Sequence, residues 1–346
     1  MVAFAETGTP ADNFPWGQTR SWSNGPGYAS GSDNGNGRVD TYTPHLIQAD
    51  GSTSNTLVLI TNGNTAYYYG LVGGNYQPRF DDGSKLTYDS GNDTYTLTDT
   101  QGDTTVLNGF GSTRPTAQRG EFASYSDPSG ETMAVTSYTT DGHVAEMQRS
   151  VTSNGTTTTE SYLYSYLPSG DANAGLLGSV TLRTQINGGV WSTVQQVQYS
   201  YYDGTQTYGG NLGDLMTATV EDGSGNALST DYYRYYTPGA ANGYTHGLEY
   251  VFNSASYTRL TAALGTDLGS LTDAQVAPYA DNAFQYDSQQ RVTQEVVQAA
   301  GDSTTSGGLG TYGFSYTTRS RLNCPYGIDQ RRCRRDNHFR YSNTIR

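Results

Sequence analysis

The chain has 346 residues and a formal net charge of −13, with 15% charged and 12% aromatic residues. This aromatic content argues against a disordered chain, because disordered segments carry few aromatic residues. Tyr is abundant with 30 copies and Gly with 43, while the single lysine is Lys85. Tyr and Thr favour strands, and Gly, Asn and Asp supply turns, so the composition predicts an all-β protein with many short hairpins.

The charge is unevenly distributed along the chain. Residues 319–346 carry eight Arg and two Asp, a charge of +6, whereas residues 1–318 carry 11 basic and 30 acidic residues, a charge of −19. A body this acidic repels phosphate backbones, which argues against nucleic acid as its partner. The basic tail loses the Gly/Thr/Tyr composition. We interpret it as a disordered or non-native tail, of the kind a reading-frame shift produces, with a basic binding arm as the alternative.

Targeting and metal-binding signals are weak. No run of eighteen apolar residues occurs, so the sequence predicts no membrane span. The start, MVAFAETGTPADNF, lacks the basic and apolar regions of a signal peptide. Cys324 and Cys333 both lie in the tail, and with His338 they still lack a fourth zinc ligand. The body relies neither on disulfides nor on thiolate metal sites.

The first third of the chain divides into a lead and a β-meander. Residues 1–37 are rich in Gly, Pro, Asn and Ser, so we expect a flexible N-terminal lead with one strand-like segment at 15–22. We expect a β-meander over 38–120. Asn62-Gly63-Asn64 separates two strand-like runs and predicts a hairpin, because Asn-Gly tolerates positive φ. The strands expected in this region are 55–61, 65–69, 85–88, 94–99 and 104–108.

Residues 121–318 have the composition of a repeat array. Tyr162, Tyr164 and Tyr166 are spaced by two, so all three are expected on one face of a strand. The spacing of apolar residues over 255–278 is helical and predicts a short helical insertion. The strands expected in the array are 122–125, 133–138, 180–185, 191–202, 215–221, 228–236 and 311–317, with the repeat resuming at Phe284 after the insertion.

A tyrosine-led motif returns at intervals of about thirty residues. Each copy has an aromatic strand end, a polar turn and a short alternating strand. The best copy is YDSQQRVTQEV from Tyr286, and looser copies start at Tyr138 and Tyr201. Repetition at this period predicts successive antiparallel hairpins in one continuous, curving sheet rather than a closed barrel. The repeat-motif positions are Tyr138, Asp141, Gly142, Tyr202, Asp203, Gly204, Tyr286, Asp287, Arg291, Val292 and Thr293.

The best copy resembles the YD repeat of RHS proteins, whose consensus is Tyr-Asp, two variable residues, Gly-Arg, an apolar residue and Thr. The Tyr, Asp, Arg, apolar and Thr positions match at 286, 287, 291, 292 and 293, whereas Gln290 replaces the usual Gly. Segments 95–110 and 123–147 are similar to those that lead into RHS arrays, and the resemblance covers residues 80–318. RHS proteins of this kind build β-hairpin strips that close into hollow shells.

The resemblance implies a non-enzymatic scaffold, secreted or at the cell surface, that encloses a toxic C-terminal segment or displays a rigid surface. The implied partners are the rest of a longer RHS polypeptide or its C-terminal cargo. Two family features are not visible, namely the core motif with its self-cleaving aspartates and a following toxin domain. The chain therefore resembles an early part of a longer RHS protein, and we expect an unpaired strand near 311–317, where the next repeat would dock.

Other chemistries fit the sequence less well. SDNGNGRVDTYT at 32–43 has EF-hand-like spacing, but Ser32 and Thr43 stand where Asp and a bidentate Glu are needed, so we expect a plain Asn-Gly turn and no metal. The acidic pairs of the body adjoin Gly residues, and we interpret them as turn aspartates rather than glycosidase carboxylates. These pairs are Asp81-Asp82, Asp99 with Asp103, and Glu221-Asp222.

No nucleophile, phosphate loop or cofactor motif is present. The serines lack a nucleophile-elbow context, and GGLG at 307–310 lacks the Lys-Ser/Thr of a phosphate loop. The histidines are scattered at His45, His143, His246 and His338. We therefore expect no enzyme and no cofactor, and disfavour a β-helical polysaccharide-degrading enzyme for want of a carboxylate constellation.

Tyrosine clusters leave one alternative function open. The clusters at 67–69, 199–202 and 232–236 could stack on sugars, as in a tyrosine-rich carbohydrate- or surface-binding adhesin whose ligand is a glycan or a cell surface. The competing explanation is that these rings pack the interior of the sheet.

Overall fold

The structure is a computed structural model, and it describes residues 2–3, 16–25, 33–49, 51, 53–80, 82–298 and 310–316. The expected tail at 319–346 and most of the expected lead before residue 16 lie outside these residues. The described chain is mostly β, as predicted, and it forms two compact units. The first unit spans 1–206 and 211–232, and the second spans 207–210 and 233–346. Each unit is described by itself below.

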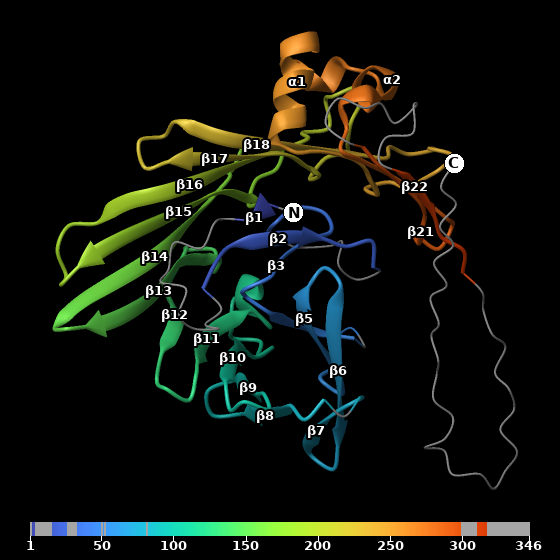
Figure 1. Cartoon of the computed structure of the whole chain (residues 1–346). Helices are drawn as coiled ribbons and strands as arrows, with labels where there is room; N and C mark the ends of the chain where they lie inside the picture. Colours follow the sequence, from blue (N-terminus) through green and yellow to red (C-terminus); the bar gives the residue numbers. More distant parts are fainter. Residues whose placement is uncertain are drawn as a thin grey trace, which may run out of the picture. The chain divides into compact units, whose positions relative to one another are not determined.

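Two short sheets open the first unit (Figure 1). The first has the order β1-β2-β3 and the second has the order β4-β5-β6-β7, and all their described pairs are antiparallel. The predicted hairpin around Asn62-Gly63-Asn64 joins β5 to β6. The strands of these sheets are β1 (Val2–Ala3), β2 (Thr19–Trp22), β3 (Arg38–Asp40), β4 (His45–Gln48), β5 (Thr56–Asn62), β6 (Thr65–Val72) and β7 (Asn75–Pro78).

A long sheet begins in the first unit and takes its strands in chain order. Its first ten strands include the predicted segments 85–88, 94–99 and 104–108, and these pair directly with the array that follows. The strands are β8 (Lys85–Asp89), β9 (Thr94–Thr98), β10 (Thr104–Asn108), β11 (Phe122–Ser126), β12 (Thr132–Tyr138), β13 (Val144–Ser153), β14 (Thr156–Tyr166), β15 (Leu177–Ile186), β16 (Ser192–Tyr201) and β17 (Leu215–Asp222). A single 3₁₀ turn, Thr116–Gln118, lies between β10 and β11.

The strand β18 (Ala227–Tyr235) crosses the boundary between the units. The second unit then continues the sheet with β19 (Leu248–Phe252), β20 (Asn282–Tyr286), β21 (Val292–Val297) and β22 (Gly310–Gly313). The predicted helical insertion lies between β19 and β20. It consists of α1 (Ser254–Leu264), α2 (Asp273–Val276) and the 3₁₀ turns Leu268–Ser270 and Ala277–Tyr279.

The long sheet confirms the predicted succession of hairpins. It has 15 strands whose order runs from β8 to β22 without a crossover, and every described pair within it is antiparallel. Its two end strands do not pair with each other, so the sheet is not closed into a barrel. Among the described residues β22 is the last strand of the long sheet and pairs only with β21.

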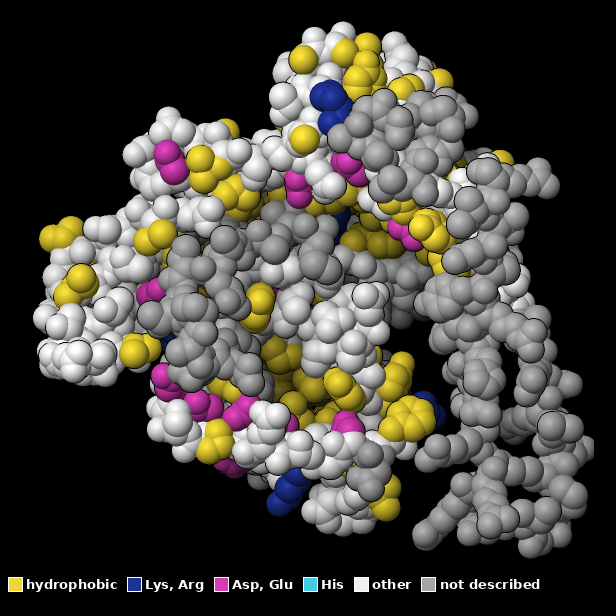
Figure 2. Space-filling model, in the orientation of Figure 1, with side chains coloured by type: hydrophobic (Ala, Val, Ile, Leu, Met, Phe, Trp, Pro, Cys, Tyr) yellow, Lys and Arg dark blue, Asp and Glu magenta, His cyan; other side chains and the backbone are white. Residues whose placement is uncertain are grey.

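A hydrophobic core joins the β4–β7 sheet to β8–β10. It contains Leu57, Tyr69 and Leu107, each at most 1% exposed, together with Leu46, Leu59, Tyr76, Leu86 and Tyr95. On the face drawn in Figure 2, Asp and Glu side chains are scattered over the surface and Lys and Arg side chains are few, in line with the acidic composition.

One tyrosine contact recurs along the long sheet and accounts for the aromatic strand ends of the repeat. A tyrosine at or after the end of one strand donates its hydroxyl to the first carbonyl of the preceding strand. This contact satisfies a carbonyl at a strand terminus while the ring packs over the neighbouring strand. The four donor and acceptor pairs, at 2.8–2.9 Å, are Tyr166 to Val144, Tyr201 to Leu177, Tyr286 to Leu248 and Tyr316 to Val292.

Replacing Tyr201 with phenylalanine should lower the free energy of unfolding by about 1–2 kcal/mol, because the substitution removes the hydroxyl that donates to the buried Leu177 carbonyl. Urea unfolding followed by circular dichroism measures the change. The control is Tyr67→Phe, since Tyr67 is 39% exposed and its hydroxyl has no hydrogen bond among the described residues. Equal effects from both substitutions would show that the recurrent contact contributes nothing to stability.

Candidate functional site

The N-terminal segment lies against one face of the long sheet, within the first unit. Trp16 packs on Tyr162 with ring centroids 4.7 Å apart, and Gln18 Nε2 donates to the Tyr164 hydroxyl at 2.8 Å. The tyrosines of β14 face this segment because they alternate along the strand, as their spacing predicted. In Figure 1, β2 and β3 lie between the long strands β13–β16 and the β4–β7 sheet. Residues 16–25 and 33–43 therefore form an enclosed segment of the first unit.

Arg20 is the centre of this contact. It is 4% exposed, and its Nε donates to Asn34 Oδ1 at 2.8 Å while Nη1 donates to the Tyr199 hydroxyl at 3.2 Å. Its Nη2 lies 3.5 Å from Asp40 Oδ2, and its guanidinium lies 5.3 Å from the Tyr199 ring centroid. Burial raises the pKa of Asp40 even though the attraction of Arg20 opposes this shift. A buried charge needs this set of partners to offset its lost hydration.

A polar cavity adjoins Arg20. It is lined by the acids Asp33, Asp40 and Glu121 and by the hydroxyls of Tyr164 and Tyr166. Burial raises the pKa of Glu121 to about 8, and the charges of Asp33 and Asp40 add to this shift.

The acid Asp33 of this cavity is paired. His143 Nδ1 lies 3.3 Å from Asp33 Oδ2, and this hydrogen bond raises the pKa of His143. The cavity thus contains paired acids and one, Glu121, whose carboxyl no described residue contacts by a hydrogen bond.

The segment 33–36 is fixed by hydrogen bonds at the other end of the contact. The Leu177 backbone N–H donates to the Asp33 carbonyl at 2.7 Å. Asn36 Nδ2 donates to the Leu212 carbonyl and to Asp214 Oδ1, both at 3.0 Å. These bonds join the segment to the start of β15 and to the loop after β16. The arrangement can hold an extended polypeptide by side-chain and backbone hydrogen bonds.

The predicted motif residues lie at their own turns, one copy at a time. Tyr138 ends β12, and Asp141 and Gly142 form the following turn, where Gly142 has φ +94°. Tyr202 follows β16 and is fully buried, and its hydroxyl donates to that of Tyr232 at 3.2 Å. The Asp203 carboxylate accepts the backbone N–H of Thr205 at 2.9 Å, and Gly204 has φ +83°.

The third copy shows why these residue types recur. Asp287 Oδ1 accepts the backbone N–H groups of Gln289 and Arg291 at 2.9 and 3.0 Å, and its Oδ2 lies 2.6 Å from Arg291 Nη2. Gln290 has φ +62°, the conformation that favours the glycine of the consensus. Val292 and Thr293 begin β21. These residues build the turn between β20 and β21.

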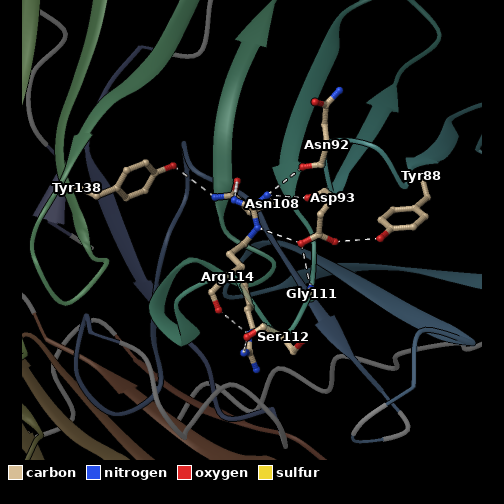
Figure 3. Close-up of polar contacts among 9 residues, drawn as sticks. Tyr88, Asn92, Asp93, Asn108, Gly111, Ser112, Arg114 and Tyr138 are labelled. Carbon is tan, nitrogen blue, oxygen red and sulfur yellow. Dashed lines mark hydrogen bonds and ion pairs between the residues drawn. The ribbon is translucent and has the colours of Figure 1, made fainter.

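A second polar cluster, which the sequence did not indicate, holds the β8–β9 turn (Figure 3). Asp93 Oδ2 accepts from Arg114 Nε at 3.2 Å and from the Gly111 N–H at 3.0 Å, while Oδ1 accepts from the Tyr88 hydroxyl at 3.0 Å. Arg114 also donates to Asn108 Oδ1 at 2.9 Å, and Asn108 Nδ2 donates to the Tyr138 hydroxyl at 3.4 Å. The cluster braces the meander against the first repeat.

Several candidate catalytic or metal-binding carboxylates accept hydrogen bonds from backbone N–H groups of their own turns. Asp82, Asp99 and Asp222 accept the backbone N–H groups of Ser84, Gln101 and Ser224 at 2.8–2.9 Å, which makes them turn aspartates as interpreted, while Asp81 lies outside the described residues. In the described part of the EF-hand-like segment, the side chains of Asp33, Asn34 and Asp40 contact His143 and Arg20. No group of three or more His, Cys, Asp or Glu that could hold a metal occurs among the described residues.

Most of the clustered tyrosines are buried. Tyr69 is 1% exposed, Tyr199, Tyr201 and Tyr202 are at most 7% exposed, and the four tyrosines of 232–236 are at most 8% exposed. Only Tyr67 and Tyr68 in these clusters present more than a third of their surface, at 39% and 38%. Packing therefore accounts for most of the rings.

No protein-family profile matches the chain, and no curated protein is detectably similar to it in sequence. Among solved structures, the chain is similar to a chain of the Tc holotoxin pore of Photorhabdus luminescens, at 10% identity and a TM-score of 0.24. The similarity covers 81% of this chain and 16% of that chain, so this chain spans less than a fifth of its length. Identity and TM-score at this level assign neither fold nor function. Within the described residues, no helix is long and apolar enough to cross a membrane.

Proposed function

We propose that this chain is a non-enzymatic segment of an RHS-type shell, secreted or at the cell surface, whose sheet encloses an extended polypeptide segment. The observation that carries the proposal is the enclosed segment itself, residues 16–25 and 33–43. It lies along the tyrosine-bearing face of β14 and β16, to which Arg20 and Gln18 bond, while Asn36 bonds to Leu212 and Asp214 in the loop after β16. A face that holds the strand pair β2–β3 in this way is suited to hold other strands.

The sheet supports the same proposal. Its strands follow one another in chain order and end at β22, so a further repeat could add to the array without any rearrangement. The YD-like turn at Tyr286–Thr293 supports an RHS-type array. On this proposal the partners are the rest of a longer RHS polypeptide or its C-terminal cargo.

A specific protease site inserted within residues 26–32 tests whether the enclosed segment is held without its covalent link. After cleavage, residues 1–25 should co-elute with the rest of the chain in gel filtration at physiological salt, because Trp16, Gln18 and Arg20 keep their contacts. Trp16→Ala should speed release at least about tenfold, since it removes a buried aromatic anchor. Immediate loss of residues 1–25 from the cleaved, otherwise unaltered chain would contradict enclosure.

The adhesin alternative depends on one surface. Tyr67 and Tyr68 are the exposed rings of the clustered tyrosines, and the Arg79 guanidinium lies 5.4 Å from the Tyr68 ring centroid. A glycan array comparing the unaltered chain with the Tyr67→Ala, Tyr68→Ala double variant tests this function. Saturable glycan binding that the double variant loses would favour the adhesin over the shell.

A further inference from the structure

The long sheet opens between β19 and β20, in the second unit. The two strands form only two register pairs, Tyr250 with Ala283 and Val251 with Asn282. Past these pairs, the Phe284 carbonyl accepts the Tyr236 hydroxyl at 2.7 Å, and the Leu248 carbonyl accepts the Tyr286 hydroxyl at 2.8 Å. The pairing of β19 with β20 is therefore limited to these two positions.

A cavity of about 200 Å³ occupies this opening. Its lining residues include Tyr236, Glu249, Tyr250, Phe284, Gln285 and Gln294. The volume is comparable with cavities of about 150 Å³ that hold one benzene ring, so the cavity suits a small group rather than a drug-sized ligand.

The aromatic wall is held in place before any ligand binds. The Tyr236 ring packs edge-on against Tyr286 with centroids 6.2 Å apart, and its hydroxyl is fixed on the Phe284 carbonyl. A side chain at Gly243 would overlap the Tyr236 ring, so the backbone of Gly243 lies directly against it. A pre-organised wall loses little conformational entropy when a ligand enters.

Glu249 is the ionisable group among these walls apart from the tyrosines, and no described residue donates a hydrogen bond to its carboxyl. The neighbouring cation, Arg234, is fully buried and is engaged elsewhere, with Nη2 3.1 Å from Asp273 Oδ1 and 2.8 Å from the Leu271 carbonyl. Burial raises the pKa of Glu249 to about 8, and the charge of Asp273 adds to the shift. Among the described residues no cation bonds to this carboxyl, although the charge of Arg234 opposes the shift in its pKa.

We propose that this cavity binds an alkylammonium group, with Glu249 as its counter-ion and Tyr236, Tyr250 and Phe284 as its aromatic wall. A cation over aromatic faces gains from their quadrupoles, and more so where water is excluded. A carboxylate restores the charge balance that burial disfavours. An anion would be repelled by Glu249 and Asp273. The proposal is independent of the enclosure proposed above, which concerns the first unit.

Titration of the full chain with tetramethylammonium or n-butylammonium chloride, followed by calorimetry, tests the proposal. We expect saturable 1:1 binding with a dissociation constant of about 1 mM or lower, and none with sodium chloride at equal ionic strength. The two probes separate a methylated ammonium from a lysine-like amine. Glu249→Gln should weaken binding at least about tenfold, whereas the matched Glu295→Gln change, outside the cavity wall, should stay within about twofold.

The pH dependence gives a second readout. Because the ligand pairs with ionised Glu249, affinity should fall about tenfold per pH unit below pH 8 and level off above it, and Glu249→Gln should remove this dependence. The other titratable groups facing Glu249 are Arg234, Asp273, Tyr236 and Tyr250, and the pKa values of both tyrosines are raised by burial, so they stay neutral in this range.

Two outcomes would overturn the proposal. One is the absence of saturable binding by both ammonium probes, and the other is binding that Glu249→Gln leaves unchanged. Binding of a neutral probe such as methyl glucoside, in place of the ammonium probes, would equally overturn it. Glu249→Gln should fold, since a neutral amide avoids the cost of a buried charge, and circular dichroism of the variant verifies this.

Discussion

Replacing Arg20 with methionine should lower the free energy of unfolding by about 3–5 kcal/mol at pH 7, because the change leaves Asp40 buried without its cation. Arg20 also bonds to Asn34 and Tyr199, so those polar groups lose their partner as well. Methionine keeps much of the side-chain volume, which limits the contribution of a cavity. Urea unfolding followed by tryptophan fluorescence measures the effect.

The same substitution at an exposed arginine is the matched control. Arg79 is exposed and lies over the Tyr68 ring, so Arg79→Met should change stability by no more than about 1 kcal/mol. Adding Asp40→Leu to Arg20→Met should recover most of the loss, since an apolar pair can replace a buried ion pair. If Arg20→Met costs no more than Arg79→Met, the enclosed segment is not held by this cluster.

Turn chemistry made much of the fold predictable. Asn62-Gly63 forms the turn between β5 and β6, and the 127–130 turn joins β11 to β12 where the sequence placed it. The helical insertion followed from helical spacing alone, and α1 buries Leu260 completely. These features depend on residues close together in the chain, which is why a single sequence reveals them.

The β13–β14 hairpin was only partly predicted. Its turn contains Asn154 at φ +50° and Gly155 at φ +77°, a strong hairpin signal. The flanking TTTTE run has no alternation of apolar and polar residues, so the sequence next to the turn lacks the two-residue period that indicates a strand. The strand β19 was missed for a similar reason, since LEYVF is short and stands alone after a long loop. Both the β13–β14 hairpin and β19 are stabilised by pairing with neighbouring strands, and the local sequence pattern carries no information about that pairing.

The candidate site could not be assembled from the sequence. Arg20 and Asp40 pair directly across the adjacent strands β2 and β3, whereas Glu121 and Tyr199 come from distant parts of the chain, and only long-range packing brings these two to Arg20. The sequence nevertheless contains one indication that Arg20 has a buried acidic partner. The body has few cations, and Arg20 stands inside a strand-like segment, where a charge needs a buried partner. The repeat motif also could not identify which tyrosine makes the recurrent contact. The motif aligns Tyr202 with the Tyr of the YD pair, but it is Tyr201 whose hydroxyl donates to the Leu177 carbonyl.

Replacing Glu121 with glutamine should raise the free energy of unfolding at pH 9 by about 2–4 kcal/mol and leave it nearly unchanged at pH 4. Burial raises the pKa of Glu121 from 4.5 to about 8, so between these values the folded state keeps a proton that the unfolded state releases. Stability of the unaltered chain therefore falls as pH rises from 4.5 to 8, by at most about 1.4 kcal/mol per unit, and is level above 8. Because glutamine cannot ionise, the stability of the Glu121→Gln variant should not show this fall with rising pH.

Glu131→Gln is the matched control for this carboxyl, because Glu131 follows the exposed turn residues Ser129 and Gly130. It should shift stability by less than about 0.5 kcal/mol at either pH. Urea unfolding of the three proteins at pH 4, 6.5 and 9 gives the whole comparison. The expected sign is the reverse of the usual acid denaturation, where carboxylates stabilise the folded state as pH rises. A Glu121→Gln variant that is less stable at pH 9 would show that the carboxylate is paired in the folded protein, and that the cavity beside Arg20 holds a counter-charge for it.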